Sequence, residues 1–311
     1  MASRSTEVIQ YLVETQDLWP KATKTKDLEN EASRALALLN EEEKAAVLRY
    51  YFVADAKMSL ASHLLKHWVV SRYAGVPWHD TKLSRDTNKK PIFVDPVTGT
   101  QPVFFNVSHQ AGIVALVAVA GYNAGQVDIG TDVVCTSERR IRDHRAIDTE
   151  GWGSFVDMHA DVFGCSEAGY LKSDELLVQG LQQQYVAHTV DSKLRCFYAL
   201  WCLREAYVKM TGEALLAPWL KDLEFRHFSA PAPASAPKQP GEAITDHEVL
   251  FHGQRVDDAN ICLRSLGPDY MTCTAVRTPG RKEDGLGWEL GPFEFLTIEE
   301  IVEHAEAHLG D

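Results

Sequence analysis

The segment FYALWCLREAYVKMTG, residues 197–212, combines a helical apolar pattern with ionisable side chains. Glu205 and Lys209 are four residues apart, so on a helix their side chains lie one turn apart on the same face. The simplest interpretation is a surface ion pair, which contributes roughly a few tenths of a kcal/mol. Taken alone, the pair indicates no chemistry, and only other polar segments can change that interpretation.

Three other short segments place polar side chains beside apolar runs. Asp132 ends an apolar run in GTDVVC, where a lone acidic residue is most often a turn former or a helix cap. Ser108 and His109, in NVSHQ, precede a buried strand, where a histidine is most often a hydrogen-bonded structural residue. The segment SRDTNKKP is by default a solvated basic turn, and it contains Arg85, Lys89 and Lys90. Each of these motifs alone is weak evidence for a functional site, so the functional interpretation depends on their combination.

Helical and strand patterns in the first half position two of these segments. Asn40 and Glu43 form a capping-box pattern, and the helical run to about residue 75 is long enough to predict a kink or two helices. This half is expected to open with helical sequence. Residues 82–102 are predicted to form a hairpin or loop, and residues 103–109 and 112–121 are predicted to be strands, the second being a buried β-branched run.

The second half carries the other two segments. A strand is expected at residues 126–134, and a polar stretch follows it to about residue 152. Helices are expected within residues 155–171 and 197–212 and at the C-terminus. Further strands are expected at residues 220–228, 247–256, 260–266 and 270–278. Residues 229–243, rich in Pro and Ala, are expected to be a flexible insertion between strands. The break near 122–126 divides the chain into halves at 1–124 and 125–311.

Composition restricts the class of protein. The chain has 311 residues, 45% of them hydrophobic and 24% charged, which is typical of a globular protein with two domains or two packed halves. The net charge of −13 argues against broad nucleic-acid binding. No apolar run reaches membrane-spanning length, and the N-terminus lacks a signal core, so a cytoplasmic protein is expected.

Cysteine and histidine usage leaves carboxylates as the candidate metal ligands. The six cysteines form no CxxC pair, so neither a disulfide framework nor a zinc site is indicated. The twelve histidines form no HExxH-like pattern. Any metal is therefore expected to be held by acidic side chains.

Taken in order, these segments resemble the Sfp-type 4′-phosphopantetheinyl transferases, whose motifs run in the same sequence. The family's basic-Lys-Pro turn corresponds to residues 89–91, its Asn-x-Ser-His segment to 106–109, and its Gly-x-Asp strand to 130–132. Its Phe-x-x-x-Glu element corresponds to 163–167, and its Trp-x-x-Lys-Glu-x-x-x-Lys helix to 201–209. The resemblance covers about residues 40–225 and is closest to the eukaryotic, broad-acceptor branch.

The resemblance implies an α+β fold, a pseudo-dimer of two similar αβ halves, each with a small, mostly antiparallel sheet packed with helices. It implies Mg²⁺-dependent transfer of the phosphopantetheine arm of coenzyme A to a serine of apo carrier domains, releasing adenosine 3′,5′-bisphosphate. The carriers would belong to fatty acid, polyketide and nonribosomal peptide synthases and to aminoadipate reductase, and the enzyme would be a monomer.

The resemblance also implies roles for individual residues. Asp132 and Glu205 would hold Mg²⁺, and Lys209 would stabilise charge on the transferring phosphate. Glu205, through a metal-bound water, or Glu167 would act as the base toward the acceptor serine. The residues expected to bind coenzyme A are Lys44, Lys57, Arg85, Lys89, Lys90, Pro91, Asn106, Ser108, His109, Asp132, Glu205 and Lys209.

Three positions depart from the family pattern or compete with it. The family often has a second acid two residues after the aspartate, and here that position is Val134. The eukaryotic branch resembles this chain in having an apolar residue there, so a water would fill that metal position. The usual lysine before the helix glutamate is Arg204, which keeps the charge. Asp128 lies four residues before Asp132 and is the reserve choice, because Asp132 has the Gly-x-Asp context.

Two other functions stay open at this point. Val134 could mark a coenzyme A-binding or carrier-binding protein that has lost catalysis. A different coenzyme A enzyme, such as an acyltransferase, would use a thioester substrate and need no metal.

Overall fold

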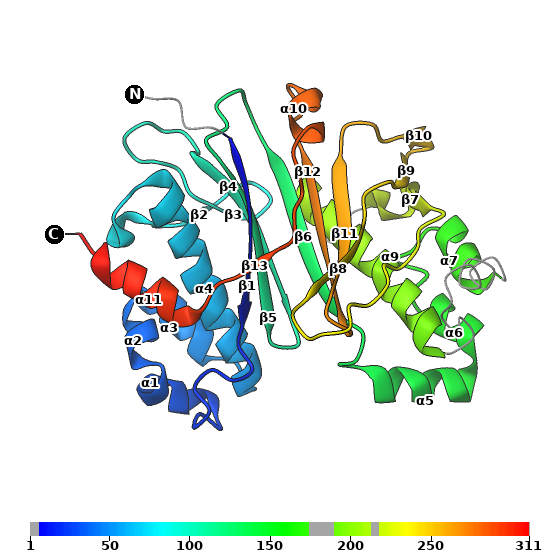
Figure 1. The fold of residues 1–311 in the computed structure, drawn as a ribbon, viewed down its shortest axis with the longest axis horizontal. Coiled ribbons are helices and arrows are strands. Elements are labelled where there is room, and N and C mark those ends of the chain that lie inside the picture. Colours follow the sequence, from blue (N-terminus) through cyan, green and yellow to red (C-terminus); the bar gives the residue numbers. More distant parts are fainter. Residues whose placement is uncertain (1–5, 174–189, 213–217, 311) are drawn as a thin grey trace.

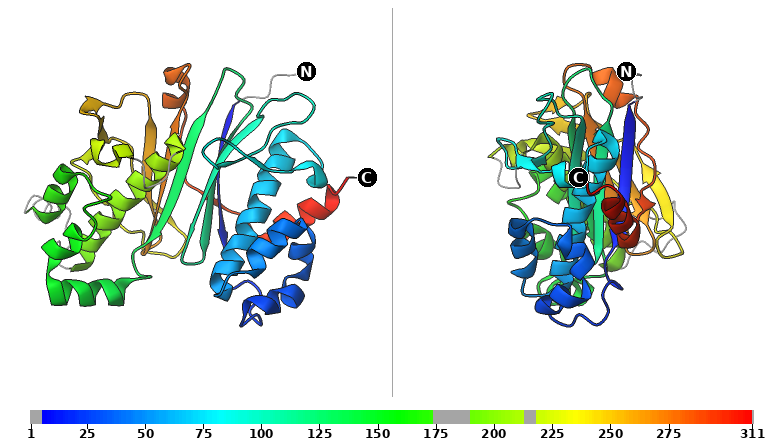
Figure 2. Two further views of the ribbon diagram at one scale, coloured as in Figure 1. Left: turned by 180° about the vertical axis from the view of Figure 1, so that it is seen from behind. Right: turned by 90° about the vertical axis from the view of Figure 1, so that its left-hand side faces the viewer.

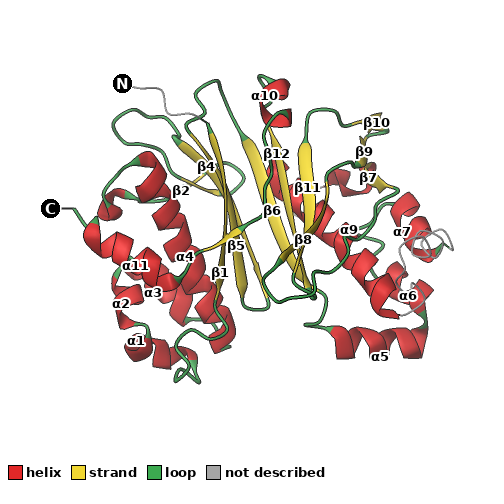
Figure 3. Ribbon diagram, in the orientation of Figure 1, coloured by secondary structure: helices red, strands yellow, loops and turns green. Residues whose placement is uncertain are grey.

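The computed structural model describes residues 6–173, 190–212 and 218–310. Figure 1 shows two sheets side by side at the centre of the molecule, with helices on both outer flanks. Figure 3 shows the same division by colour, with strands inside and helices outside. The predicted α+β fold of two similar halves is confirmed. Within the described ranges, no helix is both long enough and apolar enough to cross a membrane.

The sheet of the first half has the strand order β13-β1-β5-β4. Strands β1 (Glu7–Glu14), β5 (Ile113–Ala120) and β4 (Val103–Gln110) pair antiparallel, and the short β13 (Glu294–Phe295) pairs parallel to β1. The expectation that this half opens with helical sequence is wrong, because EVIQYLVE is rich in β-branched and aromatic residues and pairs with β5 along its whole length.

Helices cover the outer face of this sheet. The predicted capping box is confirmed: the Asn40 side chain accepts from the Glu43 amide at 2.9 Å, and Glu43 accepts from the Asn40 amide at 3.3 Å. The long helical run is two helices, as one alternative predicted, because it breaks between residues 48 and 53. The helices are α1 (Leu28–Glu31), α2 (Ser33–Ala37), α3 (Glu41–Leu48) and α4 (Val53–Ala74).

The sheet of the second half has the order β6-β12-β11-β8, with α9 (Val190–Thr211) packed on it. Its strands are antiparallel: β6 (Asp128–Cys135), β12 (Tyr270–Arg277), β11 (Asn260–Leu266) and β8 (Pro240–Ile244). A smaller sheet contains β7 (Leu223–Arg226), β9 (Glu248–Phe251) and β10 (Gln254–Arg255), and a two-stranded ribbon in the first half contains β2 (Ser84–Arg85) and β3 (Pro91–Ile92).

Two expectations for the second half need correction. The polar stretch before residue 152 contains a helix, α5 (Arg140–Glu150), followed by α6 (Trp152–Asp157) and α7 (Cys165–Lys172). The segment 229–243 does pack: its end forms β8, and the Pro231 carbonyl accepts from Arg195 at 3.0 Å. Edge pairing and polar contacts to the backbone hold this segment, and neither requires the large apolar side chains that it lacks.

The end of the chain returns to the first half (Figure 2). Beyond α10 (Lys282–Leu286), β13 pairs with β1, and α11 (Ile298–Ala307) packs beside α4 with Ile301 fully buried. The division at residues 124 and 125 stays a prediction, and β13 and α11 lie with the first of its two halves.

Strands β4 and β6 join the two sheets. The Asn106 side-chain oxygen on β4 accepts from the Thr131 amide on β6 at 3.0 Å. Apolar clusters contain side chains from both halves, such as Phe104 and Val117 with Ile129 and Val276. Strand β5 is buried on both faces, which explains its continuous apolar sequence.

Helix α9 lies directly against β6 at Gly130. A Cβ built on Gly130 would lie 2.1 Å from the Ala206 carbonyl oxygen and 2.3 Å from the Met210 amide nitrogen. Only glycine therefore permits this backbone approach. The approach places the polar residues of α9 beside those of β6.

Candidate active site

A cavity of about 840 Å³ is lined by residues of both halves. One wall comes from the end of β4 and from α4, and the other comes from β6, α5, α6 and α9. The lining residues include Ser62, Ser108, His109, Asp132, Val134, Arg139, Arg142, Asp143, Phe155, Met158, Phe197, Tyr198, Trp201, Glu205 and Lys209.

Three polar side chains meet where the halves join. Side chains alternate along β6, so Gly130 and Asp132 share the face that α9 covers. Lys209 Nζ lies 2.7 Å from Asp132 Oδ1 and donates to Ser108 Oγ at 2.9 Å. Ser108 Oγ donates to the same Asp132 oxygen at 2.8 Å. The structure thus brings together three of the residues selected from the sequence, and their role in a site stays a prediction.

Glu205 lines the same cavity but forms no hydrogen bond or ion pair with the described residues. Burial raises its pKa to about 7, the positive charge of Lys209 opposes this rise, and the negative charge of Asp132 adds to it. The pKa of Lys209 is raised, because the charges of Asp132 and Glu205 outweigh the effect of burial. The site thus holds two carboxylates and one ammonium in a small volume.

These acids are the candidate metal ligands. Among the described residues, no group of three or more His, Cys, Asp or Glu side chains is arranged to hold a metal ion. Mg²⁺, however, is commonly held by one or two carboxylates together with waters and substrate phosphates. Asp132 and Glu205 fit that pattern, since the Glu205 carboxylate has no ion-pair partner among the described residues and its pKa is raised partly by the neighbouring acid.

The basic side of the cavity begins at His109. The pKa of His109 is lowered by desolvation and then by the positive charges of Lys209 and Lys66. Burial lowers the pKa of Lys66 to about 8; Glu43 opposes this shift, and Arg85 adds to it. Lys66 was missed from the sequence, although it follows the cavity residue Ser62 by one helical turn on α4.

The basic turn lies outside the cavity lining, and its residues have other contacts. Lys90 Nζ donates to the carbonyls of Ile129 at 3.1 Å and Met210 at 3.4 Å. Arg85 donates to the Lys89 carbonyl at 2.8 Å and pairs with Pro91 across the β2–β3 ribbon. Lys90 therefore ties the ribbon to β6 and α9.

Three other expected coenzyme A-binding residues do not line the cavity. Lys44 forms an ion pair with Glu41 at 2.7 Å on the surface of α3. Lys57 is buried, and burial lowers its pKa. Asn106 is used in the contact between β4 and β6. No contact of these residues assigns them to a ligand.

The expectation that Glu167 could be the base is wrong. Its carboxylate lies 2.7 Å from Arg204, accepts from the Gly164 amide at 2.7 Å and from the Phe225 amide at 2.8 Å, and is 1% exposed. Arg204, fully buried, also donates to the Leu223 carbonyl at 2.8 Å. The pair joins α7, α9 and β7 and has no access to the cavity.

Asp132 and Asp128 differ in their partners and in their position relative to the cavity. Asp128 Oδ2 accepts from Arg277 Nε at 2.8 Å at the far end of β6, and Asp128 does not line the cavity. Asp132 does. Val134, which stands where relatives often have a second acid, also lines the cavity and leaves that position apolar.

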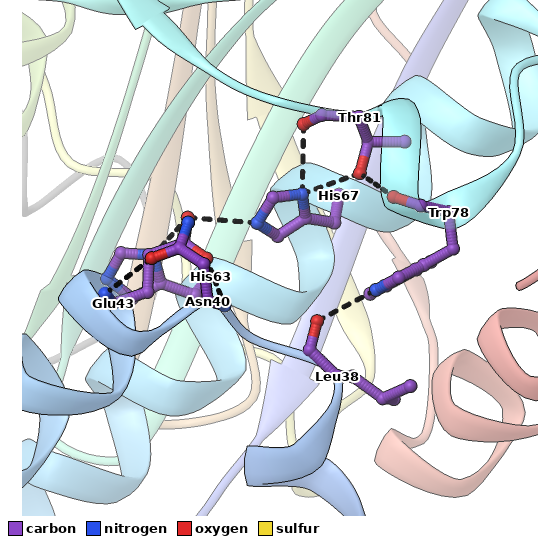
Figure 4. Close-up of polar contacts among 7 residues, drawn as sticks. All are labelled: Leu38, Asn40, Glu43, His63, His67, Trp78 and Thr81. Carbon is purple, nitrogen blue, oxygen red and sulfur yellow. Dashed lines mark hydrogen bonds and ion pairs between the residues drawn. The ribbon is translucent and has the colours of Figure 1, made fainter.

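A second polar network, outside this cavity, has the appearance of a catalytic triad (Figure 4). His67 Nδ1 lies 2.7 Å from Thr81 Oγ1, and its Nε2 lies 2.9 Å from Glu43. His63 Nδ1 also lies 3.4 Å from Glu43, and the two histidines together hold the pKa of the Glu43 carboxyl well below its usual range despite burial. Thr81 is 1% exposed, so it is no accessible nucleophile and the network is structural.

Sequence reasoning also missed the outer wall of the cavity. Arg139 and Arg142 lie there, and Tyr198 donates to Asp143 between α9 and α5. The only sequence signal was the arginine-rich run RRIRDHR, residues 139–145, within the stretch that was predicted only to be polar.

Fold and site together define a class of two-half α+β enzymes with an acid pair and a lysine at the junction. A family model described as "4′-phosphopantetheinyl transferase, N-terminal" matches residues 26–121, and one described as "4′-phosphopantetheinyl transferase superfamily" matches residues 128–263. The chain belongs to the 4′-phosphopantetheinyl transferase family.

Curated relatives agree with this assignment. The chain is 48% identical to 4′-phosphopantetheinyl transferase 1 of Fusarium mangiferae, over 98% of this chain and 97% of the relative. It is 32% identical to 4′-phosphopantetheinyl transferase NpgA of Emericella nidulans, over 86% and 87%. It is 25% identical to the mouse L-aminoadipate-semialdehyde dehydrogenase-phosphopantetheinyl transferase, over 58% and 50%.

Proposed function

We propose that this chain transfers the 4′-phosphopantetheine arm of coenzyme A to a serine of apo carrier domains. The observation that carries the proposal is the meeting of Asp132, Glu205 and Lys209 in a cavity between the two halves. In the reaction the serine oxygen bonds to the phosphorus that bears the pantetheine arm. The bond from that phosphorus to the leaving oxygen breaks, and adenosine 3′,5′-bisphosphate is released.

Asp132 and Glu205 would hold Mg²⁺, which neutralises diphosphate charge when bound. Phosphoryl transfer depends mainly on alignment and charge stabilisation. Lys209, fixed by Asp132 and Ser108, supplies a positive charge at the phosphorus. Of the two bases expected from the sequence, only Glu205 reaches the cavity.

The phosphate-rich end of coenzyme A would lie toward the basic side. Lys66 brings positive charge near the wall of the first half, where His109 supplies an imidazole, and the charge of Arg85 acts on Lys66. Lys89 adds an exposed ammonium on the same turn. These side chains would bind the 3′-phosphate and the adenine end.

The acceptors would be carrier domains of fatty acid, polyketide and nonribosomal peptide synthases and of aminoadipate reductase. Support comes from the fungal relatives and from the mouse relative, whose name includes L-aminoadipate-semialdehyde dehydrogenase. Because one chain supplies both walls of the cavity, we propose a monomer. A cytoplasmic location stays a prediction.

The test is mass spectrometry of an apo carrier domain incubated with the purified chain, coenzyme A and Mg²⁺. The expected result is a carrier heavier by one phosphopantetheine arm and release of adenosine 3′,5′-bisphosphate, with both lost when a chelator is added. An unchanged carrier mass would contradict the transferase. A product that persists under chelation would contradict the Mg²⁺ requirement alone.

A further inference from the structure

The side chain of Lys90 is directed toward the backbone of the second half. Its Nζ donates to the Ile129 carbonyl on β6 at 3.1 Å and to the Met210 carbonyl on α9 at 3.4 Å. The described residues that line the cavity do not include Lys90. An ammonium has three N–H donors, and two of them are used in these contacts. Lys90 therefore links three elements that are far apart in the sequence.

Helix α9 ends at the point where Lys90 meets it. The last four carbonyls of a helix lack partners within the helix, and its C-terminus carries partial negative charge. The Gly212 amide donates to the Val208 and Lys209 carbonyls at 3.1 and 3.3 Å. Lys90 donates to the next carbonyl, that of Met210. A cation in this place stabilises the final turn of α9, which carries Lys209.

The turn that carries Lys90 also packs directly on this helix end. A Cβ added to Gly212, whose φ is +85°, would lie 2.8 Å from Asn88 Nδ2 and 3.4 Å from Lys90 Cδ. The turn itself is held by Asp86, whose Oδ1 accepts from the Asn88 and Lys90 amides at 2.8 Å. The shape of the turn is thus fixed, and the Lys90 ammonium is fixed with it.

The two lysines of this turn have different surroundings. Lys89 is exposed, whereas Lys90 is partly buried. Burial lowers the pKa of the Lys90 ammonium. The charges of Asp128 and Asp86 oppose this shift, and the charge of Arg277 adds to it. Lys89 is therefore accessible to a ligand, and the protein itself surrounds Lys90.

We propose that Lys90 is a positioning residue that fixes the final turn of α9, holds Lys209 against Asp132, and does not itself bind coenzyme A. The inference rests on the proposed function, and it departs from the role that the resemblance implied for Lys90. Met210 follows Lys209 directly, and Ile129 lies three residues before Asp132 on β6. Because the same turn carries part of the proposed phosphate-binding side chains, this link also sets the spacing between the two ends of bound coenzyme A.

The test compares Lys90→Met with Lys89→Met, a matched loss of charge on the same turn. Calorimetric titration measures the affinity for coenzyme A, and single-turnover kinetics with Mg²⁺ and a folded apo carrier measure the rate at saturating coenzyme A. Lys90→Met is expected to bind coenzyme A within about twofold of wild type but to lose at least about tenfold in rate, because small misplacements of a reacting group are costly. Lys89→Met is expected to weaken coenzyme A binding more than it slows the saturated rate.

A second variant and hydrogen exchange test the contact itself. Lys90→Gln keeps an N–H donor for the carbonyls but carries no charge, so it is expected to lose less rate than Lys90→Met. A phosphate ligand would instead make both variants bind coenzyme A equally weakly. In the free protein, the amides of residues 208–212 are expected to exchange faster in Lys90→Met than in wild type or Lys89→Met.

Three outcomes decide the proposal. Weaker coenzyme A binding with a wild-type saturated rate in Lys90→Met would overturn it and make Lys90 a phosphate ligand. A wild-type rate with unchanged exchange at residues 208–212 would also overturn it. If Lys90→Met does not fold, Lys90→Gln takes its place in each measurement. If the wild-type protein labels no carrier, the proposed function has failed, and the exchange at residues 208–212 still decides whether Lys90 holds α9.

Discussion

Glu205 is the residue on which the proposed chemistry depends most directly. Its carboxylate lines the cavity near Asp132 and Lys209 without an ion-pair partner in the described part of the chain, and burial raises its pKa to about 7. An isolated buried acid is costly unless something balances its charge. A divalent cation with its diphosphate ligand would supply that balance, whereas the single ammonium of Lys209 is already bonded to Asp132.

The change Glu205→Gln removes this charge while keeping the shape of the side chain. We expect kcat/KM to fall at least about 100-fold, the scale seen when metal sites lose supporting groups. Because Glu205 must lose a proton to bind a cation, wild-type affinity for Mn²⁺, measured by paramagnetic resonance, should rise as the pH rises through about 7. Glu205→Gln should show weak Mn²⁺ binding with no such rise.

The control is Glu150→Gln, since Glu150 also lines the cavity but lies at the end of α5. It should keep both activity and the rise in Mn²⁺ affinity. Equal losses of kcat/KM and of Mn²⁺ affinity in the two variants would mean that the overall negative charge of the cavity accounts for both effects and that Glu205 is not a specific metal ligand.

Single residues show where the sequence was sufficient. Asp132, Glu205 and Lys209 could be predicted because their motif spacing is local on one strand and one helix. Glu167 could not be assigned correctly, because its burial against Arg204 depends on the packing of α7 on α9. Lys66 was missed for the same reason: its relation to His109 and Arg85 exists only in the folded chain.

At the scale of elements, the contact of α9 with β6 positions the site. Gly130→Ala should force the two backbones apart, because the added Cβ would lie 2.1 Å from the Ala206 carbonyl oxygen. We expect a loss of stability of about 1–3 kcal/mol, typical of overpacking, and a large loss of kcat. Thermal unfolding and single-turnover transfer measure the two effects.

A matched change is Gly169→Ala, because Gly169 lies within helix α7 with no atom within 4 Å of an added Cβ. This variant should gain roughly 0.5–1 kcal/mol, since alanine favours a helix over glycine. If Gly130→Ala were as stable and active as wild type, the close approach would not be what places Asp132 beside Lys209.

The network in Figure 4 joins α3 to α4 and to the segment before β2. The pKa of Glu43 is lower when folded than its ordinary value of 4.5, because His63 and His67 outweigh its burial. Ionised Glu43 therefore stabilises the fold fully above about pH 4.5, and this contribution is lost as the pH falls further. Glu43→Gln should cost about 1.5–3 kcal/mol at pH 7.

Urea unfolding at pH 7 and at pH 3.5 checks this prediction. The difference between wild type and Glu43→Gln should shrink at the lower pH. Glu42→Gln, a neighbouring exposed acid without a partner in the described part of the chain, should change little at either pH. A difference that stayed constant with pH would mean that packing, and not the ionised carboxylate, accounts for the effect.

Elements with strong periodicity were predicted well, and those defined by partners were not. The capping box, α9 and strands β4 to β6 follow from local pattern. Strand β1 and helix α5 do not: β1 depends on its pairing with β5, and α5 has few apolar residues and is attached through Tyr198 and Asp191. Tertiary contacts decide such segments.

At the scale of the whole molecule, the cavity exists because two halves are fixed together. Ser108 on β4 and Asp132 on β6 form a hydrogen bond across the junction. Apolar clusters that contain side chains of both halves also join the two sheets. The chain also returns through β13 and α11 to the first half. The sequence predicted the two halves but not this return, because pairing between residues near positions 11 and 294 leaves no local signal.

These connections predict that the two halves unfold as one unit. Ile301 on α11 is fully buried against the first half, so Ile301→Ala should cost about 2–5 kcal/mol. Arg34→Ala, which removes only exposed ion pairs with Glu299 and Glu306, should change the stability little, because solvent screens such pairs. If the two halves unfold together, Ile301→Ala should reduce the protection from hydrogen exchange of the slowest-exchanging amides equally in α4 and in α9. Hydrogen exchange that accelerates in α4 alone would instead show two halves that open independently, with the active site assembled only while both are closed.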